Sequence, residues 1–138
     1  MIGILIIAHG ELGKSLMECA QHVIGNAPKQ LAYLVVNSHD NPSELLPHAQ
    51  ALVASLNTGE GVLVLSDMYG ATPCNIVTQL LEPNVVEGVA GVNMPMIVRT
   101  MTYRHESLMA LVEKAVSGGR EGVVHFNNHG CDRYHSAQ

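Results

Sequence analysis

Two stretches decide the fold: Ile2-Gly-Ile-Leu-Ile-Ile-Ala-His-Gly10 and Gly61-Val-Leu-Val-Leu-Ser-Asp67. Each contains a short continuous apolar run rich in β-branched side chains, which is typical of a strand covered on both faces. The first run leads into His9 and the second into Asp67. We therefore expect both polar side chains at the carboxyl ends of buried strands.

Apolar runs and helical stripes alternate along the rest of the chain. Such alternation implies right-handed crossovers and a parallel sheet with helices on both faces. The predicted strands cover residues 2–8, 31–36, 61–66 and 85–92, and the predicted helices cover 12–24, 45–56, 72–80 and the region from 96 to about 116. We predict one doubly wound α/β domain over residues 1–126, with a mainly parallel sheet in the order 2-1-3-4. A polar segment, 127–138, is expected to be mobile.

Local signals predict several boundaries. Thr72 is expected to cap the third helix, with proline at the first helical position. Pro47 is expected to confine or kink the first turn of the second helix. The pair Gly118-Gly119 is expected to end the last helix. Residues 123–126 could form one further strand.

The composition argues against several classes of protein. A chain of 138 residues with 47% apolar content can close one core of ordinary size. The net charge is -5 and no Lys/Arg cluster is present, so we expect no nucleic acid as partner. The run from Met1 to Ala8 is too short to span a membrane and resembles no signal peptide, which favours a cytoplasmic protein without membrane insertion. Three cysteines without a CxxC pair fit reduced thiols: Cys19, Cys74 and Cys131.

The chemistry is expected where the winding of the sheet reverses. In an open doubly wound sheet, ligands bind beyond the carboxyl ends of the strands, here between the first and third strands, where His9 and Asp67 are predicted to meet. A carboxylate that holds one ring nitrogen fixes the tautomer of the imidazole and exposes the other nitrogen. Gly10, Gly70 and the helix start at Thr72 would add an anion-binding turn. Together these parts predict phosphoryl transfer.

Each of these parts also has a purely structural interpretation. A strand-end carboxylate or a threonine at a helix start often only shapes or caps a turn. Glycines near strand ends usually serve backbone geometry. A histidine after a strand is more persuasive when a carboxylate accompanies it than when it stands alone.

Two rival functions use other residues. A receiver-like signalling domain takes its phosphate on an aspartate at the place of Asp67, but it needs an acidic pair after its first strand to hold magnesium. This chain has Ala8-His9-Gly10 there, with only Glu11 nearby. A metal site near the C-terminus is the second rival, and its candidate ligands are His125, His129, Cys131, Asp132 and His135. They lack the repeated tight pairs of structural zinc sites, so a polar chain end is favoured. His39, beside Asp40, could contact a partner protein.

Three segments, in the right order, resemble the mannose-type enzyme IIA of the bacterial phosphoenolpyruvate:sugar phosphotransferase system. They are Ile4–Gly10, Gly61–Asn75 and Ala90–Met96. The resemblance extends over about residues 1–125, and Gly119–Val123 is similar to the usual ending of that family.

The resemblance implies that His9 accepts a phosphoryl group from the phosphocarrier protein HPr and passes it to a histidine of a IIB domain or protein. It also implies that Asp67 hydrogen-bonds this histidine, and that Thr72 offers the phosphate a hydroxyl where the family commonly has serine. The crevice would be lined by Asn93, Met94 and Pro95. This scheme needs no metal and no cofactor.

The resemblance further implies a homodimer in which the C-terminal strand, here residues 123–126, is exchanged with the partner subunit. The sequence departs from the family at Cys74, where phenylalanine is usual, and this points to a docking surface for a different partner. No IIB domain is expected to follow, which leaves sugar transport and a regulatory role both open.

Overall fold

The computed structural model of the chain describes residues 1–26 and 29–127. Its centre is a parallel sheet in the order β2-β1-β3-β4. The strands are β1 (Gly3–His9), β2 (Leu31–Val36), β3 (Val62–Ser66) and β4 (Val86–Ala90). This result confirms the predicted strand order, with β1 and β3 as the two inner strands.

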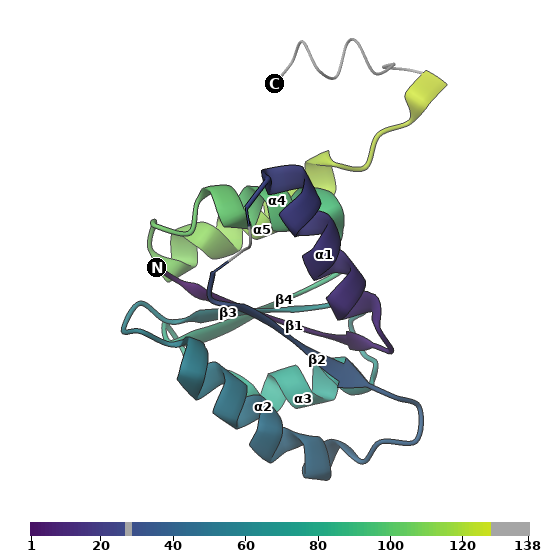
Figure 1. Ribbon diagram of the computed structural model, residues 1–138, viewed down its shortest axis with the longest axis vertical. Helices are drawn as coiled ribbons and strands as arrows, with labels where there is room; N and C mark the ends of the chain where they lie inside the picture. Colours follow the sequence, from purple (N-terminus) through teal and green to yellow (C-terminus); the bar gives the residue numbers. More distant parts are fainter. Residues whose placement is uncertain (27–28, 128–138) are drawn as a thin grey trace.

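Helices cover both faces of the sheet, as the alternating pattern predicted (Figure 1). They are α1 (Leu12–Ile24), α2 (Pro42–Leu56), α3 (Thr72–Leu80), α4 (Met94–Thr102) and α5 (Leu108–Glu121). In Figure 1, α1, α4 and α5 lie above the sheet, and α2 and α3 lie below it. The described helices include none that is both long and apolar enough to cross a membrane.

The side chains of β1 alternate between two cores. Ile4 and Ile6 join the core under α1, α4 and α5, whereas Leu5 and Ile7 join the core over α2 and α3. All four are fully buried, and burial of each contributes about 1.5–3 kcal/mol. A strand with two buried faces has no polar alternation, which is why this sequence contains a continuous apolar run.

The prediction that Gly118-Gly119 ends the last helix is wrong, because α5 continues to Glu121. These glycines lie where α5 crosses α4 closely. A Cβ at Gly118 would lie 2.9 Å from Cβ of Arg99, and a Cβ at Gly119 would lie 2.8 Å from Cε of Met96. The glycines therefore allow close packing of two helices and do not terminate one.

The region expected to be helical from 96 to about 116 is divided into α4 and α5. The second helix of this pair begins after Ser107, whose hydroxyl accepts a hydrogen bond from the Ala110 amide at 3.2 Å. Pro47 does not confine α2, which starts at Pro42 after the N-cap Asn41. In both places, a side-chain cap sets the boundary.

The segment after α5 does not form a strand within the described chain. Val123 and Phe126 are 78% and 69% exposed, and the segment extends away from the helices (Figure 1). An exchanged strand would pair only with the sheet of a partner subunit, so the exchange stays a prediction. Residues 128–138 of the expected polar segment lie outside the described residues.

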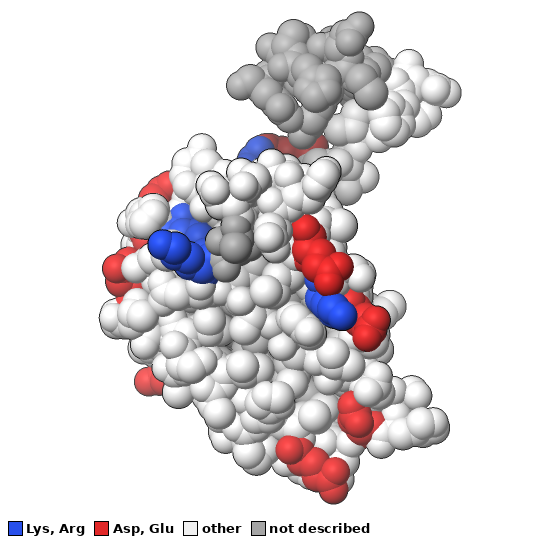
Figure 2. Space-filling model, in the orientation of Figure 1, with Lys and Arg blue, Asp and Glu red and all other residues white. Residues whose placement is uncertain are grey.

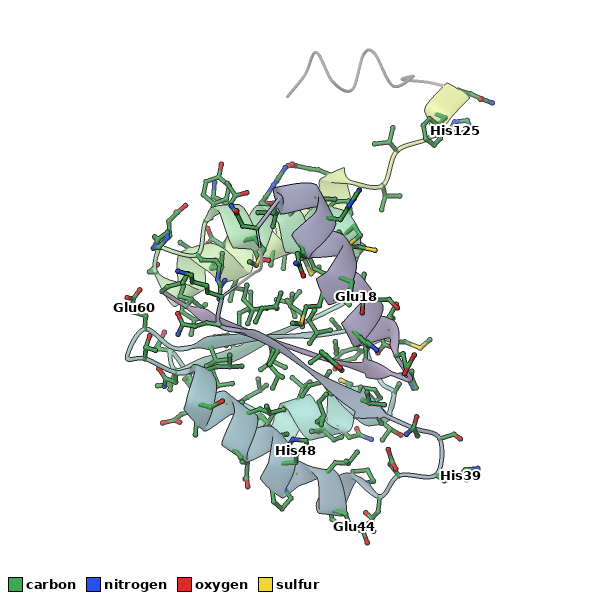
Figure 3. All side chains as sticks on the ribbon, viewed as in Figure 1. Glu18, His39, Glu44, His48, Glu60 and His125 are labelled. Atoms are coloured by element: carbon green, nitrogen blue, oxygen red, sulfur yellow. The ribbon has the colours of Figure 1, made fainter. Side chains whose placement is uncertain are left out.

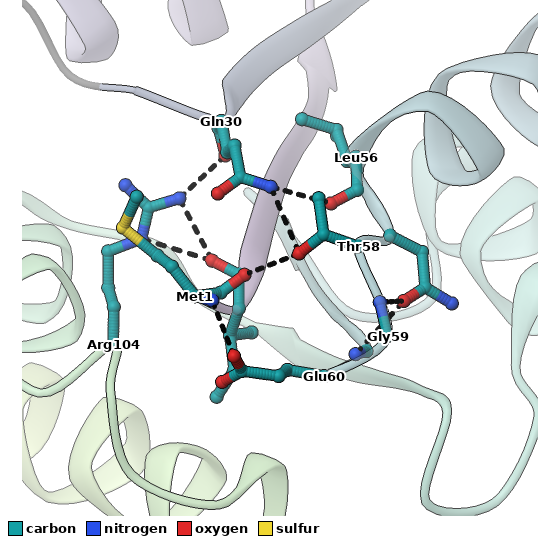
Figure 4. A network of polar contacts seen from close by, with 10 residues as sticks. Met1, Gln30, Leu56, Thr58, Gly59, Glu60 and Arg104 are labelled. Atoms are coloured by element: carbon teal, nitrogen blue, oxygen red, sulfur yellow. Dashed lines mark hydrogen bonds and ion pairs between the residues drawn. The ribbon is translucent and has the colours of Figure 1, made fainter.

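A polar network ties together the amino ends of the strands (Figure 4). One side of it is formed by Arg104, which is only 2% exposed. The guanidinium donates to the carbonyl of Ile2 from Nε at 3.1 Å and from Nη2 at 2.9 Å, and to the carbonyl of Gln30 at 2.7 Å. It also donates to the carbonyl of Lys29. Burial lowers the pKa of Arg104 to about 10, so the group is still charged at neutral pH.

Candidate functional site

His9 is the last residue of β1 and the one exposed residue of that strand. Its side chain is 48% exposed, whereas the Asp67 side chain is 13% exposed. Asp67 directly follows Ser66, the last residue of β3, and Ser66 pairs with Ile7 in the register of the sheet. Parallel pairing of β1 with β3 therefore brings together two residues that are 58 positions apart.

The two side chains are in direct contact. Nδ1 of His9 lies 2.7 Å from Oδ2 of Asp67, and the backbone amide of His9 donates to the same oxygen at 3.1 Å. An ionised carboxylate can only accept, so the proton of a neutral imidazole lies on Nδ1. The lone pair is then on Nε2, which leaves this nitrogen able to act as a nucleophile.

Asp67 is held in its ionised form. Burial alone raises the pKa of this carboxyl, but the hydrogen bonds from the ring and backbone of His9 outweigh it, and the net effect is a pKa below the ordinary value. Its other oxygen, Oδ1, is buried without a hydrogen-bond partner among the described residues. His9 thus donates hydrogen bonds to only one oxygen of the carboxylate, Oδ2.

The two helices that start next to this pair lack side-chain caps. The N-cap of α1 is Glu11 and that of α3 is Ala71, and neither side chain accepts a hydrogen bond from its helix. The other three described helices are capped by Asn41, Asn93 and Ser107. The prediction that Thr72 caps α3 is therefore wrong, since Thr72 is the first residue inside the helix. Its hydroxyl is not used as a cap.

The two predicted glycines serve backbone geometry. Gly10 and Gly70 have φ angles of 55° and 85°, in the left-handed region that favours glycine. No atom lies within 4 Å of the position that a Cβ would take at either residue. Both turns are therefore shaped by the glycine backbone, and the space beside them is open.

The three predicted residues Asn93, Met94 and Pro95 have other surroundings. Oδ1 of Asn93 accepts from the Met96 amide at 2.9 Å, and its Nδ2 donates to the carbonyl of Gly119 at 3.1 Å. Met94 and Pro95 line a groove of about 1210 Å³ between α1 and the pair α4 and α5, a groove that His9 and Asp67 do not line. The structure thus unites His9 with Asp67 but shows no polar contact between Asn93 and that pair.

The remaining candidate residues are scattered (Figure 3). His39 points outward from the loop after β2, and His125 lies beyond α5. Oδ2 of Asp40 accepts from the Asn37 amide at 2.7 Å, which fits a turn-forming role. Within residues 1–26 and 29–127, no three His, Cys, Asp or Glu side chains are grouped to hold a metal ion. The other candidate tail ligands lie outside the described residues: His129, Cys131, Asp132 and His135.

The sequence reasoning missed two exposed residues beside the site. Met68 and Tyr69 follow Asp67 in the loop between β3 and α3, and they are 60% and 85% exposed. The available signal was an aromatic and a thioether side chain within a short turn.

In the view of Figure 2, charged side chains are scattered and separated by wide uncharged surface.

Comparisons with known proteins agree on one family. Residues 3–116 match the family model EIIA-man, described as PTS system fructose IIA component. The PTS system mannose-specific EIIAB component of Escherichia coli (strain K12) is 34% identical over 125 residues, which are 88% of this chain and 38% of that protein. The chain thus spans well under half the length of this relative.

Two solved structures share the fold. The phosphotransferase system component EIIA from Streptococcus agalactiae has a TM-score of 0.82 at 23% identity, covering 93% of this chain and 99% of its own. The mannose/sorbose specific IIA subunit from Enterococcus faecalis has a TM-score of 0.79 at 20% identity, covering 90% and 93%. The match of the family model over residues 3–116 shows that this chain belongs to the EIIA-man family, the mannose-type IIA components of the phosphotransferase system.

Proposed function

We propose that this chain is a phosphoryl carrier that accepts a phosphoryl group from phosphorylated HPr on Nε2 of His9 and passes it to a IIB component. The observation that carries the proposal is the 2.7 Å contact between Nδ1 of His9 and Oδ2 of Asp67. This contact leaves Nε2 with its lone pair on a side chain that is 48% exposed. A second protein can therefore reach the nucleophile.

The transfer conserves atoms and charge in a simple way. Nε2 of His9 attacks the phosphorus of the phosphohistidine on the donor, a new P–N bond forms, and the P–N bond to the donor breaks. The donor imidazole leaves with the electron pair of the broken bond. The proton on Nδ1 of His9 stays in place, so the phosphorylated ring gains positive charge. Asp67 stabilises that charge through a charge-assisted hydrogen bond of about 1.5–3 kcal/mol.

The uncapped helix starts supply the anion contacts in this scheme. The first amides of an α-helix have no acceptor within the helix and carry the positive end of its dipole. At α1 and α3, no side-chain cap occupies them. The phosphoryl oxygens would take the place of a cap, and the hydroxyl of Thr72 would add a donor. The proposed phosphate contacts are thus these amides, the turns at Gly10 and Gly70, and Thr72.

The direct test is to phosphorylate the chain with phosphorylated HPr and map the modified residue by mass spectrometry at neutral to basic pH. We expect the phosphate on His9, with His39→Ala and His48→Ala labelled like the wild type. The phosphate should survive alkali and be lost in acid, as a phosphohistidine is. Failure of the wild type to accept phosphate from HPr would contradict the proposal.

The alternative is a receiver-like domain phosphorylated on Asp67, which the family match does not favour. Phosphorylation there would also disturb the oxygen that receives two hydrogen bonds from His9. An acyl phosphate is lost in base, so a base-labile phosphate mapped to Asp67 would support this alternative. The labelling experiment therefore separates the two functions without further variants.

The proposal includes a homodimer with an exchanged C-terminal segment. The outer side of β4 is a sheet edge, and the groove beside it is lined by residues of β4 and α5 together with Val123. An unpaired strand edge of this kind accepts a further strand. We expect the chain to sediment as a dimer and a chain truncated after Gly122 to sediment as a monomer. A monomeric full chain would contradict the exchange.

A further inference from the structure

We infer that Asn93 is a positioning residue of the dimer: its side chain fixes the end of α5, where the C-terminal segment departs and where the segment of a second copy arrives. The inference rests on the exchange included in the proposed function. Both side-chain hydrogen bonds of Asn93 go to α4 and α5, and neither goes to His9 or Asp67. This side chain therefore serves the junction of two helices.

The side chain of Asn93 closes the ends of both helices at once. Its Oδ1 accepts from the Met96 amide at 2.9 Å at the start of α4, and its Nδ2 donates to the Gly119 carbonyl at 3.1 Å in the last turn of α5. In a continuing helix the Val123 amide would bond this carbonyl, but it donates to the carbonyl of Arg120 at 3.3 Å. Asn93 thus supplies the donor that the end of α5 lacks.

Two further contacts hold the last turn of α5 against α4. Nη1 of Arg99 lies 2.6 Å from Oε2 of Glu121, and a Cβ at Gly122 would collide with the ring of Pro95. The ion pair contributes little, because the Glu121 side chain is 64% exposed. The helix end therefore lies directly on the first turns of α4, and the hydrogen bond from Asn93 to Gly119 is its main polar attachment there.

The same hydrogen bond borders the groove that would receive the exchanged segment. Asn93 and Gly119 line the groove beside β4, and so does Val123, the first residue after the cap of α5. In a two-fold exchange, each subunit sends out its own segment from this place and accepts the segment of the partner at the same place. One bond between Asn93 and Gly119 thus affects both segments, and it occurs twice in each dimer.

Loss of the Asn93 donor should weaken the dimer more than the fold. In a single chain, the last turn of a helix can fray at little cost in free energy. In the dimer, the same turn must be ordered before the segment can pair with the sheet of the partner, so the cost of ordering it opposes association. One hydrogen bond corresponds to about tenfold in affinity, and two copies correspond to about 100-fold.

Sedimentation equilibrium of the full chain measures the dissociation constant of the dimer. Asn93→Ser keeps an oxygen that can cap α4 but has no amide to reach Gly119, so the dissociation constant should rise about 100-fold. The matched control is Asn41→Ala, because Asn41 caps α2 by the same kind of contact, to the Ser43 amide at 3.0 Å, and does not line the groove. This control should lower the Tm but change the dissociation constant less than about twofold.

A second variant keeps the test independent of helix capping. Glu121→Gln removes only the exposed ion pair and should raise the dissociation constant about twofold. The inference would be overturned by a wild-type dissociation constant in Asn93→Ser, by an equal weakening in Asn41→Ala, or by a larger effect of Glu121→Gln.

The wild type separates failure of this inference from failure of the proposed function. A monomeric wild type, or a dimer that persists after truncation following Gly122, would refute the exchange and with it the basis of the inference. Labelling of His9 by phosphorylated HPr would still test the carrier function by itself.

Discussion

The two ends of the sheet are built in opposite ways. At the amino end, the buried guanidinium of Arg104 donates to three backbone carbonyls and to the sulfur of Met101, and the amino group of Met1 lies 2.7 Å from a carboxylate oxygen of Glu60. At the carboxyl end, His9 is half exposed and Oδ1 of Asp67 is buried without a partner among the described residues. The amino end of the sheet is closed by hydrogen bonds, whereas the carboxyl end keeps an exposed imidazole and an unpaired carboxylate oxygen.

The direction of the backbone explains why the two ends of the sheet differ. In a parallel sheet, the helix after each strand starts at the carboxyl edge, so free amides and positive dipole ends collect there. Four described helices start at this edge, and the outer two, α2 and α4, are capped by asparagine. The two beside His9 and Asp67, α1 and α3, are not capped. Carbonyls collect at the other edge, where a buried cation fits.

The largest expected effect is at the open end. His9→Ala should abolish phosphorylation by HPr, a loss of more than about 1000-fold, because the nucleophile itself is removed. The Tm should fall by about 5 °C at most, because Asp67 loses the hydrogen bond from the His9 ring but keeps the one from the His9 backbone amide. Labelling and a thermal melt on the same sample check both parts. Residual labelling at another residue would break the assignment of function to this end.

The second effect is at the closed end and has the opposite character. Arg104→Met should lower the free energy of unfolding by about 3 kcal/mol, because the carbonyls of Ile2 and Gln30 lose a buried donor. Arg104→Lys keeps the charge but not the planar fork, so an intermediate loss is expected. Urea denaturation measures both, and the folded variants should label His9 at the wild-type rate. A lowered rate at full folding would show that the two ends are not independent.

A smaller effect is expected where the open end also contributes to stability. Asp67→Ala should slow transfer to and from His9 about 10-fold to 100-fold and leave some phosphorylation. The pKa of Asp67 is lowered in the folded chain, so its contribution to stability is present above the pKa of the unfolded state and is lost as the pH falls through the lowered value. The difference in unfolding free energy between wild type and variant should therefore shrink toward low pH. Unchanged rates in both directions would remove Asp67 from the mechanism.

The smallest effect concerns the turn that holds the open end in place. Gly70→Ala should lower the free energy of unfolding by about 1 kcal/mol through its φ of 85°, with no steric clash. Gly118→Ala is the matched case in which packing opposes the new methyl group, because Cβ of Arg99 would lie 2.9 Å away. Denaturation curves of the two variants compare the free-energy cost of a left-handed backbone at residue 70 with that of a steric clash at residue 118. A fully stable Gly70→Ala would show that the turn does not require its left-handed backbone.

Local signals predicted the strands and the pairing well and the helix limits less well. The strand order and the meeting of His9 with Asp67 follow from alternation and the switch-point rule, and the structure confirms this geometry. The role of Gly118 was misread because a glycine can end a helix or let another helix approach. The side chain that decides between these readings, Arg99, is 19 residues away in the sequence.

The environments of one exposed tyrosine and one buried arginine were not predicted from the sequence. In the sequence, Tyr69 looks like an ordinary turn residue. Only the structure shows that its side chain is 85% exposed, in the loop that follows Asp67. Arg104 resembles any surface cation until its carbonyl partners, 74 to 102 positions away, are assembled around it. Exposure and hydrogen bonding of this kind depend on contacts distant in sequence.

By itself the sequence determined the layered fold and the position of His9 and Asp67 at strand ends, because apolar runs and helical stripes are local patterns that set which faces are buried. Tertiary structure alone decided that α1 and α3 lack caps, that Asn93 is committed to the junction of α4 with α5, and that the His9 ring presents Nε2. These properties depend on which groups find hydrogen-bond partners. Partners from separate strands and helices meet only when the sheet has formed.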